Sequence, residues 1–171
     1  MKNRYGIDIW SDDNFFIEDG VVKVNYKPYP SLIKIVKDVR KQGFKGPLLL
    51  RFPHITKKQV KTLFNTFNAS IKEYDYKGKF NAVFPLKVNQ LPNFIHPLVS
   101  YGKKYNYGLE AGSKAELIIA MTYNNMGSPI TINGFKDKEM IHLCFIAKSM
   151  GHDITVIIEG LNELEMILEV L

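Results

Sequence analysis

The sequence predicts an α/β fold in which part of a (β/α) barrel follows a short β-rich segment. Apolar extended runs recur every 23 to 25 residues, beginning near residues 81, 106, 129 and 154. Helical patterns lie between and after them, at about 93–103, 113–125, 137–150 and from Asn162. Because strand–helix alternation of this period is typical of parallel barrels, the four units predict half of an eight-stranded barrel.

The first 27 residues are predicted to form strands outside this barrel. Two runs rich in β-branched and aromatic residues, at 5–10 and 21–24, are separated by stretches that contain Asp, Asn, Ser and Gly. Such residues favour turns and end strands. We therefore interpret residues 1–27 as a β-strand segment with short connections.

Residues 28–78 are predicted to connect the two parts as helix, strand and helix. Ser31 is the expected cap of a helix that ends near Gly43 and turns inward Leu32, Ile35, Val36 and Val39. An extended run at 47–52 is the expected strand. The second helix is expected from about Thr56, and its inward face is Val60, Leu63, Phe64 and Phe67.

Residues 79–171 hold the predicted half-barrel. Two of its helices begin with capping boxes, Ser113–Glu116 and Asn162–Glu165. Pro97 lies where it would interrupt a long first helix. Because a half-barrel leaves an edge strand unpaired and an apolar interior open to water, we expect a truncated barrel, the front part of a longer polypeptide.

The composition is that of an ordinary globular protein. The 171 residues are 46% hydrophobic and 23% charged, and they contain no run of 18 apolar residues that would span a membrane. The first residues lead into an acid-containing stretch rather than the apolar core of a secretion signal. The single cysteine, Cys144, predicts a reducing, cytoplasmic setting, and we expect it to be a buried helix residue.

The net charge of +6 raises the possibility of a nucleic-acid partner. Residues 1–120 hold 20 basic and 10 acidic side chains, whereas residues 121–171 hold 3 and 7. The lysines occur singly or in pairs, so we interpret them as solvated surface residues and expect neither a nucleic-acid nor a membrane partner. A basic nucleic-acid-binding or regulatory module is kept as the alternative from another class of function.

Lys87 is the strongest candidate for chemistry. It is a single cation near the end of the apolar run 81–90, and the carboxyl ends of barrel strands carry active sites. A lysine in an apolar pocket has its charged form disfavoured, so its amine can form a Schiff base with an aldehyde such as pyridoxal phosphate. From spacing alone, a strand-end lysine that extends into solvent is the simpler alternative.

Two further turns bring polar residues to the same predicted edge. Glu110 ends the next strand and is expected beside Lys87, where its carboxylate can hold a cofactor-linked lysine. Asn133 ends the strand after that, although an asparagine before glycine is also an ordinary turn residue. Glu116 is explained equally well by its capping box. The four histidines show no metal-ligand spacing, so no metal-binding residue is predicted.

Five stretches of sequence carry a resemblance to a known family. FPLKVNQ at 84–90, GLEAGSKAEL at 108–117 and NGFKDKEMI at 133–141 occur in order, between an opening from Tyr5 to Asp12 and a closing stretch from Gly151 to Glu159. Together they resemble the N-terminal portion of biosynthetic arginine decarboxylases, which are pyridoxal-phosphate enzymes of the alanine racemase-like class. The resemblance covers essentially the whole chain.

The resemblance implies a barrel of the alanine racemase type, with residues 1–27 belonging to a separate β-domain. It implies decarboxylation of L-arginine to agmatine, on the route to putrescine and spermidine, with pyridoxal 5'-phosphate as the cofactor and magnesium as a further requirement. Lys87 matches the lysine that holds the cofactor, Glu110 and Glu116 match acidic positions near it, and Asn133 joins this cofactor site by its place at the edge. The complete enzyme is expected to be a cytoplasmic homo-oligomer.

Family members are several-fold longer than this chain. The resemblance places a histidine stacked on the cofactor, a glycine-rich phosphate loop and the acidic partner of the pyridine nitrogen beyond position 171. We therefore expect the 171-residue chain to be inactive alone. Decarboxylases of diaminopimelate, ornithine or carboxynorspermidine share the strand lysine and a turn ending in S-K-x-E, so these substrates remain alternatives.

Overall fold

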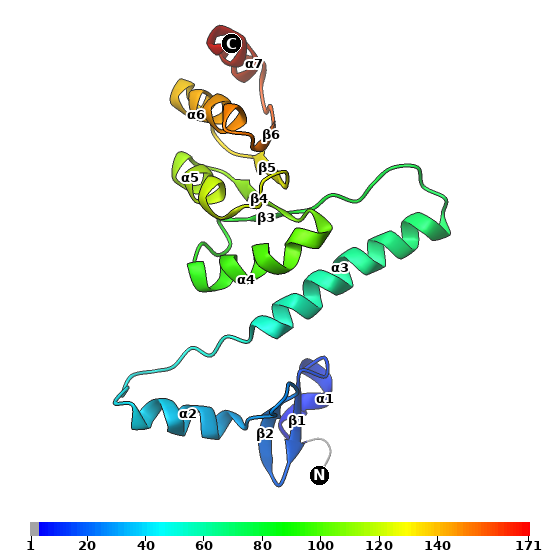
Figure 1. Ribbon diagram of the computed structural model, residues 1–171, viewed down its shortest axis with the longest axis vertical. Helices are drawn as coiled ribbons and strands as arrows, with labels where there is room; N and C mark the ends of the chain where they lie inside the picture. Colours follow the sequence, from blue (N-terminus) through cyan, green and yellow to red (C-terminus); the bar gives the residue numbers. More distant parts are fainter. Residues whose placement is uncertain (1–3) are drawn as a thin grey trace. The chain divides into compact units, whose positions relative to one another are not determined.

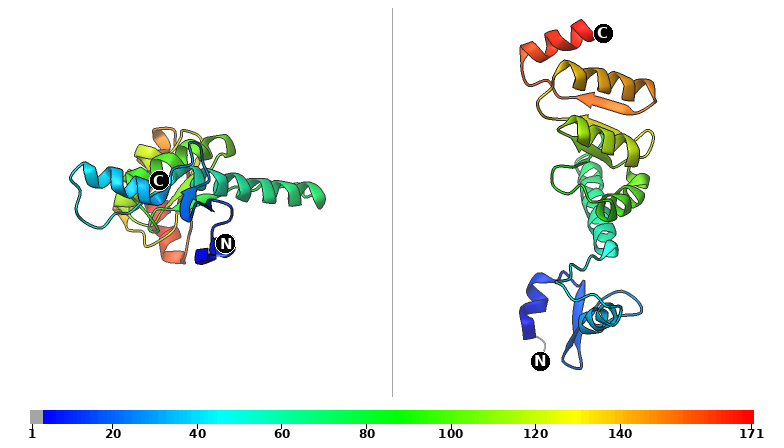
Figure 2. Two further views of the ribbon diagram at one scale, coloured as in Figure 1. Left: turned by 90° about the horizontal axis from the view of Figure 1, so that it is seen from below. Right: turned by 90° about the vertical axis from the view of Figure 1, so that its left-hand side faces the viewer.

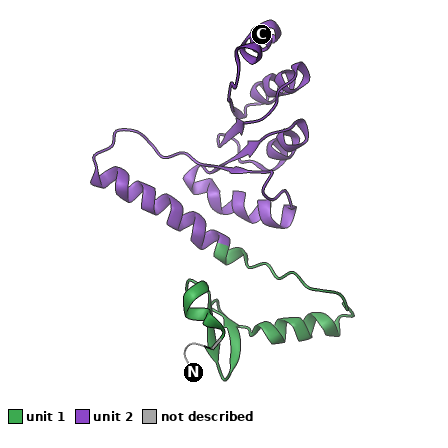
Figure 3. Cartoon of the chain, turned by 180° about the vertical axis from the view of Figure 1, so that it is seen from behind, with its two compact units in different colours: residues 1–55 green, residues 56–171 purple. Residues whose placement is uncertain are grey.

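The computed structural model describes residues 4–171, which divide into two compact units at residue 55 (Figure 3). The first unit comprises residues 1–55 and the second comprises residues 56–171. Residues 1–3 of the predicted strand segment lie outside the described residues.

The first unit is built on an antiparallel hairpin. Strand β1 (Phe15–Glu18) pairs with strand β2 (Val21–Val24), which is the strand expected at 21–24. The turn between them is Asp19-Gly20, and both residues have positive φ values, 51° and 75°. Asp and Gly tolerate this left-handed region better than other residues, which explains why the chain reverses here.

The strand predicted at 5–10 is wrong. A 3-10 turn, η1 (Arg4–Gly6), leads into a short helix, α1 (Ile7–Trp10). Tyr5 and Gly6 have positive φ values, which interrupt an extended backbone. The indole Nε1 of Trp10 then donates to the Tyr5 carbonyl at 2.9 Å, so local turn contacts override the β propensity of this run.

The helix expected after Ser31 is α2 (Leu32–Lys41). The Ser31 hydroxyl accepts the Lys34 N–H at 3.2 Å, which confirms the predicted cap. Gly43, at φ 94°, follows the helix and donates its N–H to the Arg40 carbonyl at 3.0 Å. The predicted inward face is half-buried, and its members are Leu32, Ile35, Val36 and Val39.

The strand predicted at 47–52 is also wrong, because these residues form irregular structure with no strand partner among the described residues. The Phe52 ring instead packs edge-on against Phe15, with the ring centroids 5.5 Å apart. Helix α3 (Pro53–Glu73) follows and begins three residues before the predicted Thr56.

Only part of the predicted inward face of α3 is buried. Val60 and Phe64 are 5% and 2% exposed, whereas Leu63 is 36% exposed, so the prediction is wrong for Leu63. Phe67 is 45% exposed, but its ring stacks on Phe80 with the ring centroids 3.8 Å apart. Phe64 stacks on Tyr105 with the ring centroids 4.7 Å apart. Aromatic residues therefore contact the predicted inward face of α3 at both Phe64 and Phe67.

The second unit contains four parallel strands in the order β3-β4-β5-β6 (Figure 1). Each strand leads into a helix on the same face of the sheet, and Figure 2 shows these helices beside one another. The strands are β3 (Val83–Pro85), β4 (Gly108–Ala111), β5 (Pro129–Ile132) and β6 (Asp153–Val156). The helices are α4 (Pro92–Gly102), continued by η2 (Lys103–Tyr105), α5 (Lys114–Tyr123), α6 (Lys138–Ser149) and α7 (Leu161–Val170). The α/β fold with a partial (β/α) barrel is confirmed.

The core lies between the sheet and these helices. Successive strand residues point to opposite faces, and the face toward the helices is fully buried at Leu109, Ala111, Ile130 and Ile132. Glu110 and Thr131, which alternate with them, face the other side. Cys144 on α6 is 5% exposed, as expected, and burial raises the pKa of its thiol to about 11.

Of the two predicted capping boxes, the structure has a side-chain cap at Ser113 but none at Asn162. The Ser113 hydroxyl accepts the Glu116 N–H at 3.3 Å and caps α5, as the box predicts. The box at Asn162 is wrong, because α7 begins at Leu161 and Gly160 occupies the cap position without a side-chain hydrogen bond.

Pro97 lies inside α4, which continues through it. Across residues 4–171, no helix is both long enough and apolar enough to span a membrane.

Candidate active site

Lys87 lies in the turn after β3 rather than inside the strand. The Leu86 N–H donates to the Glu110 carbonyl at 2.9 Å, which is the last sheet-like bond, and the Val88 N–H then donates to the Pro85 carbonyl at 3.1 Å. The Lys87 side chain is 67% exposed. The Lys87 amine is therefore accessible at the carboxyl edge of the sheet in this part of the protein.

Glu110 is the charged neighbour of Lys87. The parallel register places Glu110 between Pro85 of β3 and Thr131 of β5. Its Oε1 lies 3.9 Å from the Lys87 Nζ, and its side chain is only 18% exposed. The carboxylate is thus held in a partly buried place from which it attracts the exposed ammonium.

Asn133 joins the pair from β5. Its backbone N–H donates to the Ala111 carbonyl at 3.0 Å, and its side-chain Nδ2 donates to the Glu110 Oε2 at 3.4 Å. One oxygen of Glu110 therefore faces Lys87 and the other faces Asn133. The structure brings together these three residues at the edge where the sequence predicts them.

Glu116 has a different set of contacts from the one its capping box predicts. Its Oε2 accepts the Gly112 N–H at 2.7 Å, and its Oε1 accepts the Gln90 amide at 3.0 Å. The side chain is 8% exposed. Glu116 therefore links the loop that follows Lys87 to the loop that follows Glu110, and the structure does not place it in contact with Lys87 itself.

A buried ion pair at the same edge is missing from the sequence predictions. Lys136 is 1% exposed, and its Nζ lies 3.1 Å from the Glu163 Oε2. The same Glu163 oxygen accepts the Glu159 N–H at 2.9 Å. These partners are 27 residues apart, and sequence spacing does not pair them. The available signal was a lysine within a glycine turn, which is an unusual place for a fully buried charge.

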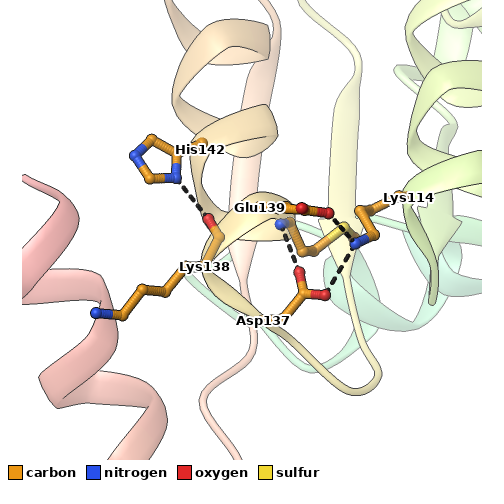
Figure 4. A network of polar contacts seen from close by, with 6 residues as sticks. Lys114, Asp137, Lys138, Glu139 and His142 are labelled. Carbon is orange, nitrogen blue, oxygen red and sulfur yellow. Dashed lines mark hydrogen bonds and ion pairs between the residues drawn. The ribbon is translucent and has the colours of Figure 1, made fainter.

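An exposed charge network surrounds the start of α6 (Figure 4). Lys114 Nζ lies 2.8 Å from Asp137 Oδ2 and 2.6 Å from Glu139 Oε2. These hydrogen bonds, that of Asp137 first, raise the pKa of Lys114, and the bond from Lys114 lowers the pKa of Asp137. Asp137 also caps α6 by accepting the Met140 N–H at 2.8 Å. The network links the starts of α5 and α6.

The residues of a magnesium site are not gathered in this part of the protein. Across residues 4–171, no three His, Cys, Asp or Glu side chains are grouped so that they could hold a metal ion. A hard cation such as magnesium needs several oxygen ligands in octahedral arrangement. The residues present in 4–171 do not fit magnesium.

The Glu163 carboxylate predicts a pH dependence of stability. The Glu159 N–H first, and the Lys136 ammonium second, lower the pKa of Glu163 below its ordinary value of 4.5. A carboxyl with a lowered pKa contributes stability above its ordinary pKa, and this contribution is lost as the pH falls through its pKa in the folded protein. We expect the urea concentration at the unfolding midpoint to decrease as the pH is lowered below about 4.5.

Glu163→Gln should remove this part of the pH dependence. Glu165→Gln, which changes an exposed carboxyl on the same helix, is the control and should keep it. Identical acid profiles for Glu163→Gln and the unchanged protein would contradict the prediction.

The fold defines the structural class of this part of the protein. The parallel array of βα units is part of a (β/α) barrel of the alanine racemase-like fold, and Lys87 and Glu110 lie at its carboxyl edge. The structure of diaminopimelate decarboxylase from M. jannaschi matches 93% of this chain and 33% of its own, with a TM-score of 0.65 and 22% identity, which supports the fold.

Three relatives of higher sequence identity are biosynthetic arginine decarboxylases. The crystal structure of the biosynthetic arginine decarboxylase from Campylobacter jejuni matches with a TM-score of 0.94 and 61% identity, over 97% of this chain and 28% of its own. The biosynthetic arginine decarboxylase of Prochlorococcus marinus (strain MIT 9515) is 36% identical over 98% of this chain and 27% of its own length. That of Citrifermentans bemidjiense is 40% identical over 97% of this chain and 27% of its own length.

These comparisons confirm the predicted resemblance: nearly the whole chain is similar to the N-terminal portion of biosynthetic arginine decarboxylases. The chain spans about a quarter of the length of the curated relatives it matches. No family model matches the chain.

Proposed function

We propose that this chain supplies the lysine-bearing part of a pyridoxal-phosphate-dependent decarboxylase that converts L-arginine to agmatine and carbon dioxide, an entry to putrescine and spermidine. The observation that carries the proposal is the meeting of Lys87, Glu110 and Asn133 at one sheet edge. Its support is the 61% identity to the Campylobacter jejuni arginine decarboxylase over 97% of the chain.

The residues at the edge fit the proposed cofactor. An aldehyde needs an accessible amine, and the Lys87 side chain is 67% exposed beside the Glu110 carboxylate. Pyridoxal phosphate, when bound, supplies a ring that takes up the electrons released as carbon dioxide leaves. Lys87 is the proposed catalytic residue and the covalent anchor of this cofactor.

The other three residues are proposed to shape the cofactor site. Glu110, 3.9 Å from the Lys87 Nζ, attracts and orients the lysine side chain. Asn133 donates to the other oxygen of Glu110 and so holds the carboxylate in place. Glu116 holds Gln90 and the Gly112 N–H, which keeps the two loops flanking Lys87 and Glu110 together.

Arginine is the proposed substrate because the more similar relatives are named for it. The likeness to diaminopimelate decarboxylase, at 22% identity, shows the fold alone. Diaminopimelate, ornithine and carboxynorspermidine therefore remain competing substrates to be assayed beside arginine. We expect agmatine to form faster than the product of any of these three.

Borohydride reduction tests the cofactor lysine. The full-length protein, incubated with pyridoxal phosphate and reduced, should carry the cofactor on Lys87 when its peptides are analysed by mass spectrometry. Label on another lysine would contradict the site, and no label at all would contradict the cofactor. The isolated 171-residue chain should form no agmatine, and measurable turnover by it would contradict the proposed dependence on further residues.

Some expectations stay predictions. A homo-oligomeric enzyme, a cytoplasmic location and a magnesium requirement need measurements on the full-length protein. The proposed enzyme has neither a nucleic-acid nor a membrane partner. A basic nucleic-acid-binding module would instead be retained on an anionic matrix in a strongly salt-dependent way.

A further inference from the structure

The ion pair between Lys136 and Glu163 fixes one carbonyl group of the β5–α6 loop. Lys136 Nζ lies 3.1 Å from the Glu163 Oε2 and donates to the Gly134 carbonyl at 2.5 Å. The Lys136 and Glu163 side chains are 0% and 9% exposed. Because a buried ammonium must be both paired and hydrogen-bonded, Lys136 has little freedom to leave the Gly134 carbonyl.

Gly134 contacts the neighbouring loop, which follows β4 and contains Gly112. A Cβ atom at Gly134 would lie 2.6 Å from the Gly112 carbonyl oxygen and 3.0 Å from the Gly112 Cα, so the backbones of the two loops are in direct contact. Asn133, one residue earlier, donates its backbone N–H to the Ala111 carbonyl at 3.0 Å. Asn133 and Gly134 are therefore held by β4 through the Asn133 N–H and by Lys136 through the Gly134 carbonyl.

The first residue of this held segment, Asn133, carries the side-chain amide that contacts Glu110. Asn133 Nδ2 donates to Glu110 Oε2 at 3.4 Å, and Glu110 Oε1 faces the Lys87 Nζ at 3.9 Å. We infer that Lys136 and Glu163 are positioning residues that set Asn133 and, through it, the Glu110 carboxylate beside Lys87. The inference rests on the proposed function, in which Lys87 holds the cofactor.

A pair that only stabilised the fold would behave differently when both partners are replaced. Apolar side chains of similar size commonly substitute for a buried ion pair without loss of stability, because the desolvation of both charges is relieved. The double variant Lys136→Met/Glu163→Met should therefore fold, yet it lacks the donor to the Gly134 carbonyl. A purely structural role predicts an unperturbed site in this variant, and a positioning role predicts a perturbed one.

The experiment uses the full-length protein and three measurements. They are the urea unfolding midpoint, backbone hydrogen exchange at residues 133–136 of the cofactor-free protein, and the dissociation constant of pyridoxal phosphate from a fluorescence titration. We expect an unchanged midpoint, exchange at 133–136 faster by on the order of tenfold, and a dissociation constant raised by on the order of tenfold.

Lys138→Met is the matched control. It removes a lysine two residues from Lys136, but the ion pair of Lys138 with Glu169, at 2.7 Å, is exposed, with side chains 63% and 61% accessible. Because exposed pairs contribute little, this variant should match the unchanged protein in all three measurements.

Two results would overturn the inference. One is a double variant whose exchange rate at 133–136 and dissociation constant equal those of the unchanged protein. The other is a raised dissociation constant with unchanged exchange at 133–136, since the cofactor site would then respond by another route. If the double variant does not fold, Glu163→Gln takes its place and should still speed exchange at 133–136, and unchanged exchange there would again overturn the inference.

The two proposals can fail separately. Exchange is measured without cofactor, so it reports on the loop whether or not pyridoxal phosphate binds. An unchanged full-length protein that does not bind pyridoxal phosphate would contradict the proposed function, while the exchange rates would still decide whether Lys136 and Glu163 hold the loop.

Discussion

Replacing Lys87 by alanine in the full-length protein should lower kcat for arginine decarboxylation by at least about 10²–10⁴-fold, the range for loss of a positioned proton-transfer group. The variant loses the amine that anchors the proposed cofactor and the cation that Glu110 faces at 3.9 Å. Agmatine formed per enzyme, separated by chromatography and measured at saturating arginine and pyridoxal phosphate, gives the effect directly.

Lys103→Ala is the matched control for this prediction. Lys103 is an exposed lysine at the end of α4, and its removal should leave kcat unchanged. Because Lys87 is 67% exposed, its replacement should also leave the unfolding midpoint close to that of the unchanged protein. Activity that survives in Lys87→Ala would remove the central residue from the proposed function.

Gly108→Ala should lower the free energy of unfolding by about 3 kcal/mol, the upper part of the range for overpacking a well-packed site. A Cβ atom there would lie 1.9 Å from the Pro129 carbonyl oxygen and 2.8 Å from the Pro129 carbonyl carbon. These are backbone atoms of β5, so no side-chain rotation relieves the clash, and β4 and β5 must separate. Urea unfolding followed by circular dichroism measures the change.

Gly46→Ala separates this steric effect from the general effect of replacing glycine. A Cβ atom at Gly46 meets nothing within 4 Å. Alanine there should leave the free energy of unfolding nearly unchanged or raise it slightly, because it restricts the unfolded chain. Equal stabilities of the two variants would show that the strands can accommodate a methyl group at Gly108.

The barrel units were predictable because each repeats the same local signals. The predicted starts at 129 and 154 differ by at most one residue from the observed Pro129 and Asp153. The convergence of Lys87, Glu110 and Asn133 followed from topology, since parallel strands end at one edge. Periodicity and chain direction therefore carried most of the fold and the outline of the site.

The errors arose where non-local or backbone-specific contacts decide the structure. Residues 5–10 have β propensity, but the positive φ of Tyr5 and Gly6 turns them into a short helix. The sequence pattern places Glu163 in a helix start, whereas its carboxylate accepts a hydrogen bond from Lys136 of another loop. A pattern search along the chain does not reveal a partner that only folding brings close.

The buried thiol on α6 has a practical consequence for experiments on this part of the protein. Cys144 is the only cysteine of the 171 residues, and at a pKa of about 11 its reactive thiolate is on the order of one molecule in ten thousand at pH 7. A cysteine introduced at an exposed position would therefore take up a maleimide dye or spin label almost exclusively. Cys144 would therefore add little background labelling. Distances between probes in these residues can be measured without first replacing this native cysteine.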